Sequence, residues 1–430
     1  MVESKSLLIK GGRVIESSSG TDEVLDIYIE DGKIKKLGKN LKISGVEVVD
    51  AKGKIVLPGF IDMHTHLREP GREDVETILS GSKAAVYGGF TSICCMPNTT
   101  PPIDNASTLE YIIERARGAH CNVYPVGTIT KGRRGEELSE MAELKNLGAV
   151  GFSDDGRSVK DSLLMRRAME YSLMLDAPIL SHCEDETLSV GGCMNEGYTS
   201  TILGLPGIPK ESEEIIVIRD LFLAELTGAR LHICHVSTKR SVELIREAKR
   251  RGVKVTCEVT PHHFTLTEEA VTSFDTNTKV NPPLRTEEDI RAIEGGLKDG
   301  TIDVIASDHA PHLITEKEYE YQQAPFGMIG LQTALPLVMR QLVEKRILTL
   351  PEAVAKLTCN PAKILNLPKG TIKVGRDADL TILDTEKEWI FKPEEIQSLS
   401  KNSPFTGWEF KGKLIYTIVA GRVEFCEEGI

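Results

Sequence analysis

The chain has 430 residues, of which 40% are hydrophobic and 27% charged, and its net charge is −12 at pH 7. These values are typical of a soluble globular protein that is too long for one small domain. The acidic balance argues against a nucleic-acid-binding protein, and no hydrophobic run approaches the ~20 residues of a membrane-spanning helix.

Two further features bear on the cellular compartment. Residues 1–5 do not lead into the long hydrophobic core and cleavage site of a secretory signal. Nine cysteines are scattered without a framework, and several lie in strand-like runs where a free thiol packs as a small hydrophobic group. We therefore expect a cytoplasmic protein whose cysteines are reduced.

Both ends of the chain have the pattern of short strands and turns. Alternating segments lie at residues 7–9, 12–15, 26–29, 33–37, 380–383 and 414–419. The Asp31-Gly32 step between two of them is a good hairpin signal. Neither end looks self-sufficient, so we expect residues 1–55 and 366–430 to pair into one small β-sandwich domain.

Between the two ends, strand-like runs alternate with amphipathic helical patterns. The predicted strands lie near residues 55–61, 91–95, 122–126, 150–152, 178–181, 230–234, 253–259 and 303–306. The predicted helices, with hydrophobic residues three and four apart, include residues 80–87, 106–117, 163–175, 213–226, 241–251 and 287–297. This alternation predicts an α/β protein whose residues 56–365 form a (β/α)8 TIM-like barrel. A doubly wound open sheet is the alternative.

His64 and His66 follow the first predicted barrel strand. Residues two apart on a strand point to the same side, so the two imidazoles can meet at one point. Imidazole nitrogen is a ligand that suits zinc. A histidine pair alone is modest support for a metal site, because core or solvated pairs are about as common.

Four more candidate ligands stand at the ends of later predicted strands: Asp155, His182, His235 and Asp308. Any one of them has an ordinary structural explanation, such as a helix cap for an aspartate. Six at successive strand ends favour the closed barrel, whose active site lies on that face, and provide ligands for two zinc ions with a shared bridge.

Zinc-bound hydroxide would be the nucleophile at such a centre, and a carboxylate beside the metal can move the proton. We assign that general base and acid role to Asp308. Four further histidines are expected to be structural or to hold a ligand in place: His232, His262, His263 and His309. Cys183 and Cys234 adjoin ligands, but alternation turns them to the other side.

Three motifs carry a resemblance to a known family. They are Asp-Met-His-Thr-His-Leu-Arg-Glu-Pro-Gly at residues 62–71, Met-Pro-Asn-Thr at 96–99 and Ser-Asp-His-Ala-Pro-His at 307–312. With Phe-Ser-Asp-Asp-Gly at 152–156, the chain resembles the longer, bacterial and archaeal dihydroorotases of the amidohydrolase superfamily, nearly end to end. The resemblance implies reversible interconversion of N-carbamoyl-L-aspartate and L-dihydroorotate, a cyclic amide hydrolysis of pyrimidine biosynthesis.

The resemblance also implies a distribution of the metal ligands. His64 and His66 would bind the first zinc with Asp308, and His182 and His235 would bind the second, with Asp155 between the two ions. Many amidohydrolases place a carboxylated lysine where this chain has Asp155. Because aspartate is much shorter, we expect the second zinc site to be the more weakly occupied one. Asp154 is the neighbouring alternative, although alternation points it the other way.

Substrate recognition follows from the same resemblance. It assigns Arg68, Asn98 and His312 to the substrate carboxylate, which an arginine can grip through two hydrogen bonds. Asn281 and the backbone of Phe326 and Gly327 would surround the ring. The ordinary alternatives are a surface salt bridge for Arg68, to Glu69 or Glu73, and a turn residue for Asn98. Residues 313–325 are either a mobile lid or a solvated loop.

Two alternative functions remain open on the sequence. An allantoinase or hydantoinase shares the barrel and the metals, but typically uses the lysine bridge and lacks the arginine after the second histidine. A non-catalytic partner of aspartate carbamoyltransferase is disfavoured, because such proteins have lost zinc ligands and this chain retains six candidates. As partners we expect the small-molecule substrate, further copies in a homo-oligomer, and an aspartate carbamoyltransferase.

Overall fold

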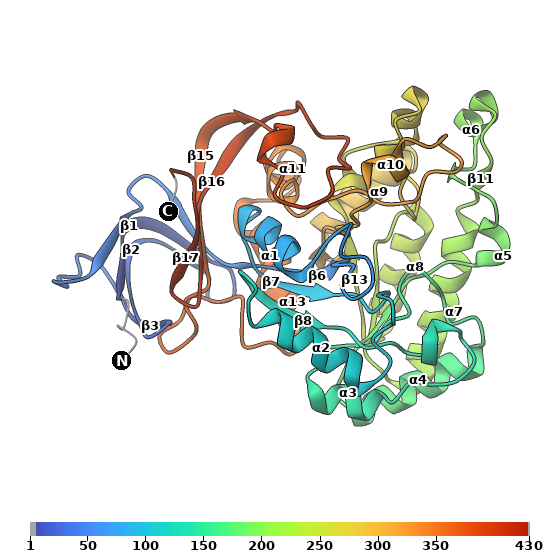
Figure 1. The fold of residues 1–430 in the computed structure, drawn as a ribbon, viewed down its shortest axis with the longest axis horizontal. Helices are drawn as coiled ribbons and strands as arrows, with labels where there is room; N and C mark the ends of the chain where they lie inside the picture. Colours follow the sequence, from blue (N-terminus) through green and yellow to red (C-terminus); the bar gives the residue numbers. More distant parts are fainter. Residues whose placement is uncertain (1–5, 429–430) are drawn as a thin grey trace.

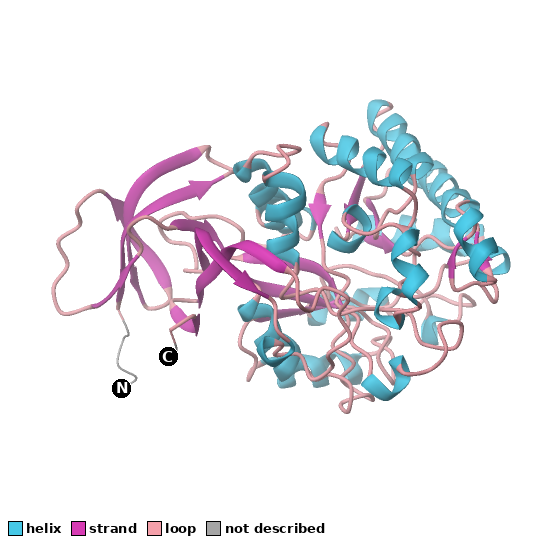
Figure 2. Cartoon of the chain, turned by 90° about the horizontal axis from the view of Figure 1, so that it is seen from above, coloured by secondary structure: helices cyan, strands magenta, loops and turns pink. Residues whose placement is uncertain are grey.

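The computed structural model describes residues 6–428 and has a β-rich part beside a larger part of mixed helices and strands (Figures 1 and 2). The β-rich part is one eight-stranded sheet in the order β17-β16-β15-β5-β1-β2-β3, with β4 beside β1. Its strands are β1 (Leu7–Glu16), β2 (Thr21–Glu30), β3 (Lys33–Gly38), β4 (Glu47–Asp50), β5 (Ile55–Pro58), β15 (Leu380–Ile390), β16 (Glu409–Val419) and β17 (Arg422–Cys426). The predicted pairing of the two chain ends is therefore confirmed.

The strand predicted at residues 55–61 is in fact two strands. Ile55–Pro58 pairs with β1 and β15 in the terminal sheet, whereas β6 (Phe60–Thr65) opens the barrel. Gly59 separates them, and a Cβ at this position would lie 2.1 Å from the Thr91 hydroxyl oxygen. Strand β5 thus belongs with the terminal sheet, while domain limits at 55/56 and 365/366 stay a prediction.

The barrel strands are parallel and form two runs. They are β6, β7 (Phe90–Cys95) and β8 (Asn122–Pro125) in one, and β9 (Ile179–Ser181), β12 (Leu231–Ile233), β13 (Val255–Val259) and β14 (Val304–Ile305) in the other. Phe152 pairs with Gly127 and with Ile179, which joins β8 to β9. His309, in the segment after β14, pairs with Thr65 and so joins the end of the second run to β6. The ring is closed, so the (β/α)8 barrel is confirmed and the open doubly wound sheet is wrong.

Helices surround this ring. They are α1 (Ile78–Tyr87), α2 (Ala106–Ala116), α3 (Met141–Leu147), α4 (Ser162–Met174), α5 (Glu186–Ser189), α6 (Tyr198–Leu203), α7 (Glu211–Thr227), α8 (Lys239–Arg250), α9 (Glu287–Lys298), α10 (Ile314–Lys317), α11 (Ala334–Val338), α12 (Leu350–Leu357) and α13 (Cys359–Ile364). Each of the six predicted helical segments corresponds to one of them: α1, α2, α4, α7, α8 and α9. Two short strands, β10 (Met194–Asn195) and β11 (Gly207–Ile208), pair outside the ring. Threonine side chains cap the N-termini of several helices, as Thr77 does for α1 and Thr238 for α8.

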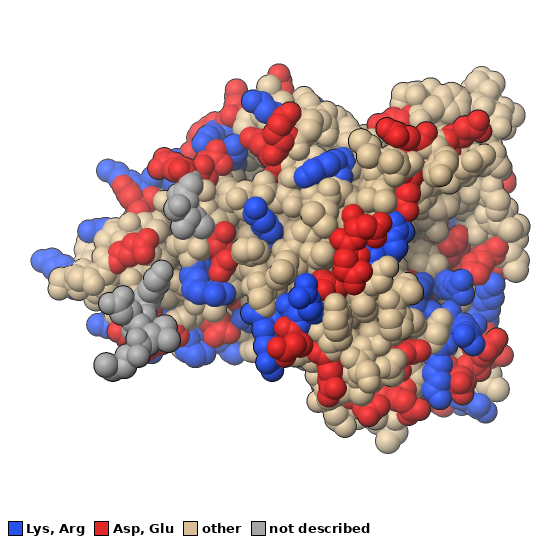
Figure 3. Space-filling view, viewed as in Figure 1, with Lys and Arg blue, Asp and Glu red and all other residues tan. Residues whose placement is uncertain are grey.

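The hydrophobic residues divide between these parts. A large core lies between the barrel strands and their helices, a smaller one fills the ring around Met63, Cys94 and Cys234, and a third lies within the terminal sheet. All nine cysteines lie in the described range and are free. None of the helices within residues 6–428 is long and apolar enough to cross a membrane. Acidic and basic side chains are mixed over the face drawn in Figure 3, which shows no continuous basic surface.

Candidate active site

The six predicted metal ligands meet at the carboxyl ends of the barrel strands. They come from β6, from the segment after Phe152, and from the residues that follow β9, β12 and β14. Each is at most 8% exposed: His64, His66, Asp155, His182, His235 and Asp308. Side chains separated by up to 244 residues in the sequence therefore share one buried centre.

Asp155 stands in the middle of this group. Its Oδ1 lies 3.2 Å from His64 Nε2, 3.6 Å from His182 Nδ1 and 3.7 Å from His235 Nε2. Its Oδ2 lies 3.5 Å from His66 Nε2. One short carboxylate thus faces all four imidazoles, which is the arrangement that a bridging ligand requires.

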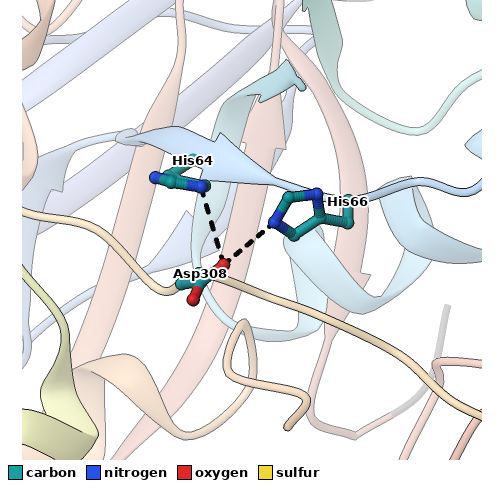
Figure 4. A group of neighbouring side chains, drawn as sticks. All are labelled: His64, His66 and Asp308. Carbon is teal, nitrogen blue, oxygen red and sulfur yellow. Dashed lines mark hydrogen bonds and ion pairs between the residues drawn. The ribbon is translucent and has the colours of Figure 1, made fainter. Parts of the chain in front are cut away.

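Asp308 completes a second side of the centre. Its Oδ1 is 3.0 Å from His66 Nε2 and 3.6 Å from His64 Nε2, as Figure 4 shows. Burial opposes the ionisation of Asp308, but the adjacent His64 and His66 outweigh it and hold the pKa of the carboxyl below its usual range. The side chain is therefore a carboxylate at neutral pH and can accept a proton.

The donor set fits a metal ion. His64 Nε2 and Asp155 Oδ1 are both buried without a hydrogen-bond partner, which is costly unless another group satisfies them. Ligand atoms of His64, His66 and Asp308, and likewise of His64, Asp155 and His235, lie within 4.8 Å of one another. Imidazole and carboxylate groups at such spacing are the ligands of divalent metal sites in enzymes.

Asp154 takes no part in this centre. Its Oδ1 accepts hydrogen bonds from the backbone N–H groups of Ile129 and Thr130, at 2.8 and 3.0 Å. Alternation along the chain therefore turns Asp154 and Asp155 to opposite sides. The four histidines predicted to be structural lie as follows: His232 contacts Glu258, His263 the Pro282 carbonyl and His309 Glu76, and His262 is buried beside His263.

A cavity of about 220 Å³ opens above the metal ligands. Eleven of the twelve predicted site residues line it, and His64 is the one that does not. The lining residues are His66, Arg68, Asn98, Asp155, His182, His235, Asn281, Asp308, His312, Phe326 and Gly327, together with Gly156 and Ala310. The structure thus brings the predicted ligands and the predicted substrate residues to one place.

Arg68 forms the cationic side of this cavity. Its Nε donates to the Pro311 carbonyl at 3.2 Å, and its Nη2 lies 3.3 Å from His312 Nε2. Glu69 pairs instead with Arg115, so the surface salt bridge considered for Arg68 is absent within residues 6–428. Burial lowers the pKa of Arg68 to about 10, which leaves it charged at neutral pH. Burial and the adjacent Arg68 lower the pKa of His312 to about 2, so that imidazole is neutral.

Arg68 and two of the six candidate metal ligands adopt an uncommon backbone conformation. Arg68, His235 and Asp308 have φ of +59°, +31° and +46°, although none is glycine. Such conformations cost free energy and persist at sites that the surrounding structure enforces. Asn98 also has a part in positioning, because its Oδ1 lies 2.9 Å from His66 Nδ1.

Residues 313–325 lie in the chain between the cavity residues His312 and Phe326 and contain α10. Lys317 and Tyr321 are buried, and Lys317 Nζ donates to the carbonyls of Thr276 and Pro325. Lys279 Nζ donates to the Gln322 and Ala324 carbonyls. These contacts anchor the segment at Lys317 and beside Lys279, and its interpretation as a lid or a solvated loop stays a prediction.

Two glutamates beside the metal ligands were missing from the sequence-based set. Glu258 Oε1 lies 2.6 Å from His64 Nδ1, and its Oε2 lies 3.1 Å from His232 Nε2. Glu184 Oε2 lies 3.0 Å from His182 Nε2. Each follows from a visible signal: Glu258 is a charged residue inside a hydrophobic strand, and Glu184 is two residues from a ligand on the same side of the chain.

Known proteins resemble this chain along nearly its whole length. The dihydro-orotase-like family matches residues 53–241, and the amidohydrolase family matches residues 290–425. The dihydroorotases of Pelotomaculum thermopropionicum and Geobacter metallireducens are each 55% identical, over 97% and 98% of this chain and 98% and 99% of their own length. The solved structure of L-hydantoinase (dihydropyrimidinase) from Arthrobacter aurescens has a TM-score of 0.87 at 28% identity, over 99% of this chain and 96% of that one.

The unsatisfied atoms at the centre lead to a prediction about stability. Removal of divalent metal with a chelator is expected to lower the melting temperature, since a ligand at 100 times its dissociation constant stabilises by about 2.7 kcal/mol. Asp155→Asn should shrink this shift and the bound metal, whereas Asp154→Asn should change the baseline stability and keep the shift. Differential scanning calorimetry with metal analysis measures both. Equal shifts in the two variants would contradict a bridging role for Asp155.

Proposed function

The chain belongs to the dihydroorotase family of amidohydrolases, and on that basis we propose that it is a zinc enzyme that interconverts N-carbamoyl-L-aspartate and L-dihydroorotate. The observation that supports this most is the single cavity in which a buried set of metal ligands faces an arginine without a carboxylate partner. A cyclic amide with a ring carboxylate presents both groups that such a cavity would bind.

We propose two zinc ions at the centre. His64, His66 and Asp308 would hold one, and His182 and His235 the other, with Asp155 shared between them. Bound zinc polarises an amide carbonyl and lowers the pKa of water. The ion at His182 and His235 is the one expected to be held less tightly, because the short Asp155 side chain serves both positions.

The side chains supply the remaining chemistry. Arg68, with Asn98 and His312, would fix the substrate carboxylate and so orient the ring over the metal ligands. Asp308, a carboxylate held beside His66, would take a proton during attack on the amide carbonyl and return it to the departing nitrogen. Asn281 and the backbone at Phe326 and Gly327 would contact the ring.

The alternatives have weaker support. Hydantoinases share the fold with this chain at 28% identity or less, whereas the 55% identical relatives are dihydroorotases. A non-catalytic scaffold has no need of six converging buried ligands, and all six are present. We therefore keep the catalytic function as the conclusion.

The proton-transfer role of Asp308 is testable by removing its charge. Asp308→Asn is expected to reduce kcat for dihydroorotate hydrolysis by about 10²-fold or more, because the amide cannot accept the proton. Bound zinc, measured by metal analysis on the same sample, should persist. Turnover within twofold of the unchanged chain would reject this role.

The carboxylate contact is testable with two substrates. Arg68→Gln is expected to lower kcat/KM for dihydroorotate by about 10- to 100-fold, the loss of a hydrogen bond to a charged group. Hydrolysis of 5,6-dihydrouracil, which has no carboxylate, should change little. Arg72→Gln is the matched control, since Arg72 pairs with Asp74 and Glu316 outside the cavity. Equal losses for both substrates would contradict carboxylate recognition by Arg68.

We further propose that the chain forms a homodimer through α7 and its neighbours. Four hydrophobic side chains follow one exposed face of α7, at Ile215, Ile218, Phe222 and Leu226, while its opposite face is buried against the barrel. A surface helix normally carries polar groups on its outer face. Helix α7 packs between α4 and α8 and contacts α5 (Figure 1).

The extent of this surface favours a second copy. On α4, around α5 and on α7, nine large hydrophobic side chains are 37–81% exposed: Leu163, Leu173, Met174, Leu188, Val190, Ile215, Ile218, Phe222 and Leu226. Helices α4 and α5 both contact α7, so these side chains lie on neighbouring elements, and exposed hydrophobic groups gathered in this way are typical of a protein–protein contact. Between the exposed Glu211 and Glu225, all the exposed side chains of α7 are hydrophobic, so two copies of this acidic chain can meet there.

The dimer is tested by its mass in solution. Light scattering after gel filtration is expected to give twice the mass of the chain, and Phe222→Asp should give a monomer because it buries a charge in the contact. Phe274→Asp changes an exposed phenylalanine elsewhere and should leave the dimer intact. A chain that is monomeric alone and associates only with an aspartate carbamoyltransferase would overturn this assignment.

A further inference from the structure

Glu184 lies where the metal centre meets the substrate cavity. Glu184 is two residues after His182, in the segment that follows β9, and its side chain is 13% exposed. Ser158 fixes the backbone here, because its hydroxyl donates to the His182 carbonyl at 2.5 Å and accepts from the Glu184 N–H at 2.9 Å. The carboxylate therefore has a defined position beside the centre.

One oxygen of this carboxylate receives two hydrogen bonds. Glu184 Oε2 lies 3.0 Å from His182 Nε2 and accepts from Asn281 Nδ2 at 2.9 Å. His182 is a candidate metal ligand, and Asn281 lines the substrate cavity. Glu184 Oε2 thus contacts both a candidate metal ligand, His182, and a residue of the substrate cavity, Asn281.

The contact also determines which nitrogen of His182 is free. Its Nδ1 points to the centre, 3.6 Å from Asp155 Oδ1 and 2.9 Å from His235 Nε2. A carboxylate at Nε2 keeps the proton on that nitrogen and leaves the Nδ1 lone pair for a metal. On the other side, occupation of Asn281 Nδ2 leaves Oδ1 of that amide to accept an N–H from a ring in the cavity.

A purely structural role does not account for these contacts. Helix α5 begins two residues later, and Asp185 already caps it, since its side chain accepts from the Thr187 N–H. The nearby cation Lys160 pairs with Glu186 and not with Glu184. Glu258 makes a comparable contact with His64, but it joins that ligand to the buried His232 and not to a cavity residue.

We propose that Glu184 is a positioning residue that couples the metal ligand His182 to the substrate contact Asn281. The inference rests on the proposed dihydroorotase function for its substrate half, while its metal half stands on the geometry of His182. Loss of Glu184 would then weaken zinc binding and substrate binding together, although this residue would contact neither.

The test compares three variants of the full chain. Glu184→Ala is expected to weaken zinc affinity about 10- to 100-fold, the usual cost of losing a group that orients a metal ligand. It should also raise KM for dihydroorotate measured at saturating zinc. Glu184→Gln keeps an oxygen that can accept both hydrogen bonds, so it should recover most of the KM. Asp185→Ala, which removes only the cap of α5, should lower the melting temperature and leave zinc affinity and KM unchanged.

The outcomes separate this proposal from the proposed function. Zinc affinity is read by competition with a chromophoric chelator and needs no substrate, so it tests the His182 contact even if dihydroorotate is not turned over. Coupling to Asn281 requires that the KM effects of Glu184→Ala and Asn281→Ala fall short of additive in the double variant. Unchanged zinc affinity in Glu184→Ala, additive KM effects, or the same losses in Asp185→Ala would each overturn the proposal. If Glu184→Ala does not fold, Glu184→Asp withdraws the same oxygen and must show the same losses.

Discussion

The structure depends on one buried carboxylate that faces four imidazoles. Asp155 can do so only if β6, β9 and β12, which position His64, His182 and His235, are held in one ring with their carboxyl ends at the same face. The closed ring of parallel strands provides this, since each strand ends at the same face. The two bridges of Phe152, to Gly127 and to Ile179, are therefore as important as the longer ladders, because they place the segment with Asp155 between β8 and β9.

Burial of these ligands has consequences for the residues around them. Taking imidazoles and carboxylates out of water is costly unless their remaining polar atoms are bonded, and the chain meets this need with Glu258 at His64 and Glu184 at His182. The left-handed backbone at His235 and Asp308 turns these side chains back over the strand ends. The glutamate contacts and the left-handed backbone thus both keep the candidate metal ligands in the buried centre.

The sequence predicts the candidate ligands whose positions follow from strand alternation and from the ends of the predicted strands. It located His64 and His66 by their two-residue spacing, and it separated Asp155 from Asp154 by the side to which each must point. It placed one barrel strand at residues 55–61, because hydrophobic runs do not show that Gly59 divides two sheets. The exposed face of α7 was invisible for a related reason: periodicity shows which residues are hydrophobic, but not whether the same chain covers them. The role of Glu258 depends on His64, which is 194 residues away in the sequence. Glu184 is only two residues from His182, but this spacing alone does not reveal its contact with Asn281.

Under our proposal that Arg68 binds the substrate carboxylate, specificity among enzymes of this fold depends on one cation. The chain has a net charge of −12, yet the Arg68 guanidinium in its cavity forms no ion pair with a carboxylate within residues 6–428, and His312 beside it is neutral. Had Arg68 paired with Glu69, the substrate carboxylate would have to compete with an internal one; instead Glu69 is occupied by Arg115. Partial removal from water strengthens the attraction of Arg68 for an anion, while its pKa near 10 keeps it charged. A ring that carries a carboxylate gains from this arrangement, and an uncharged cyclic amide does not.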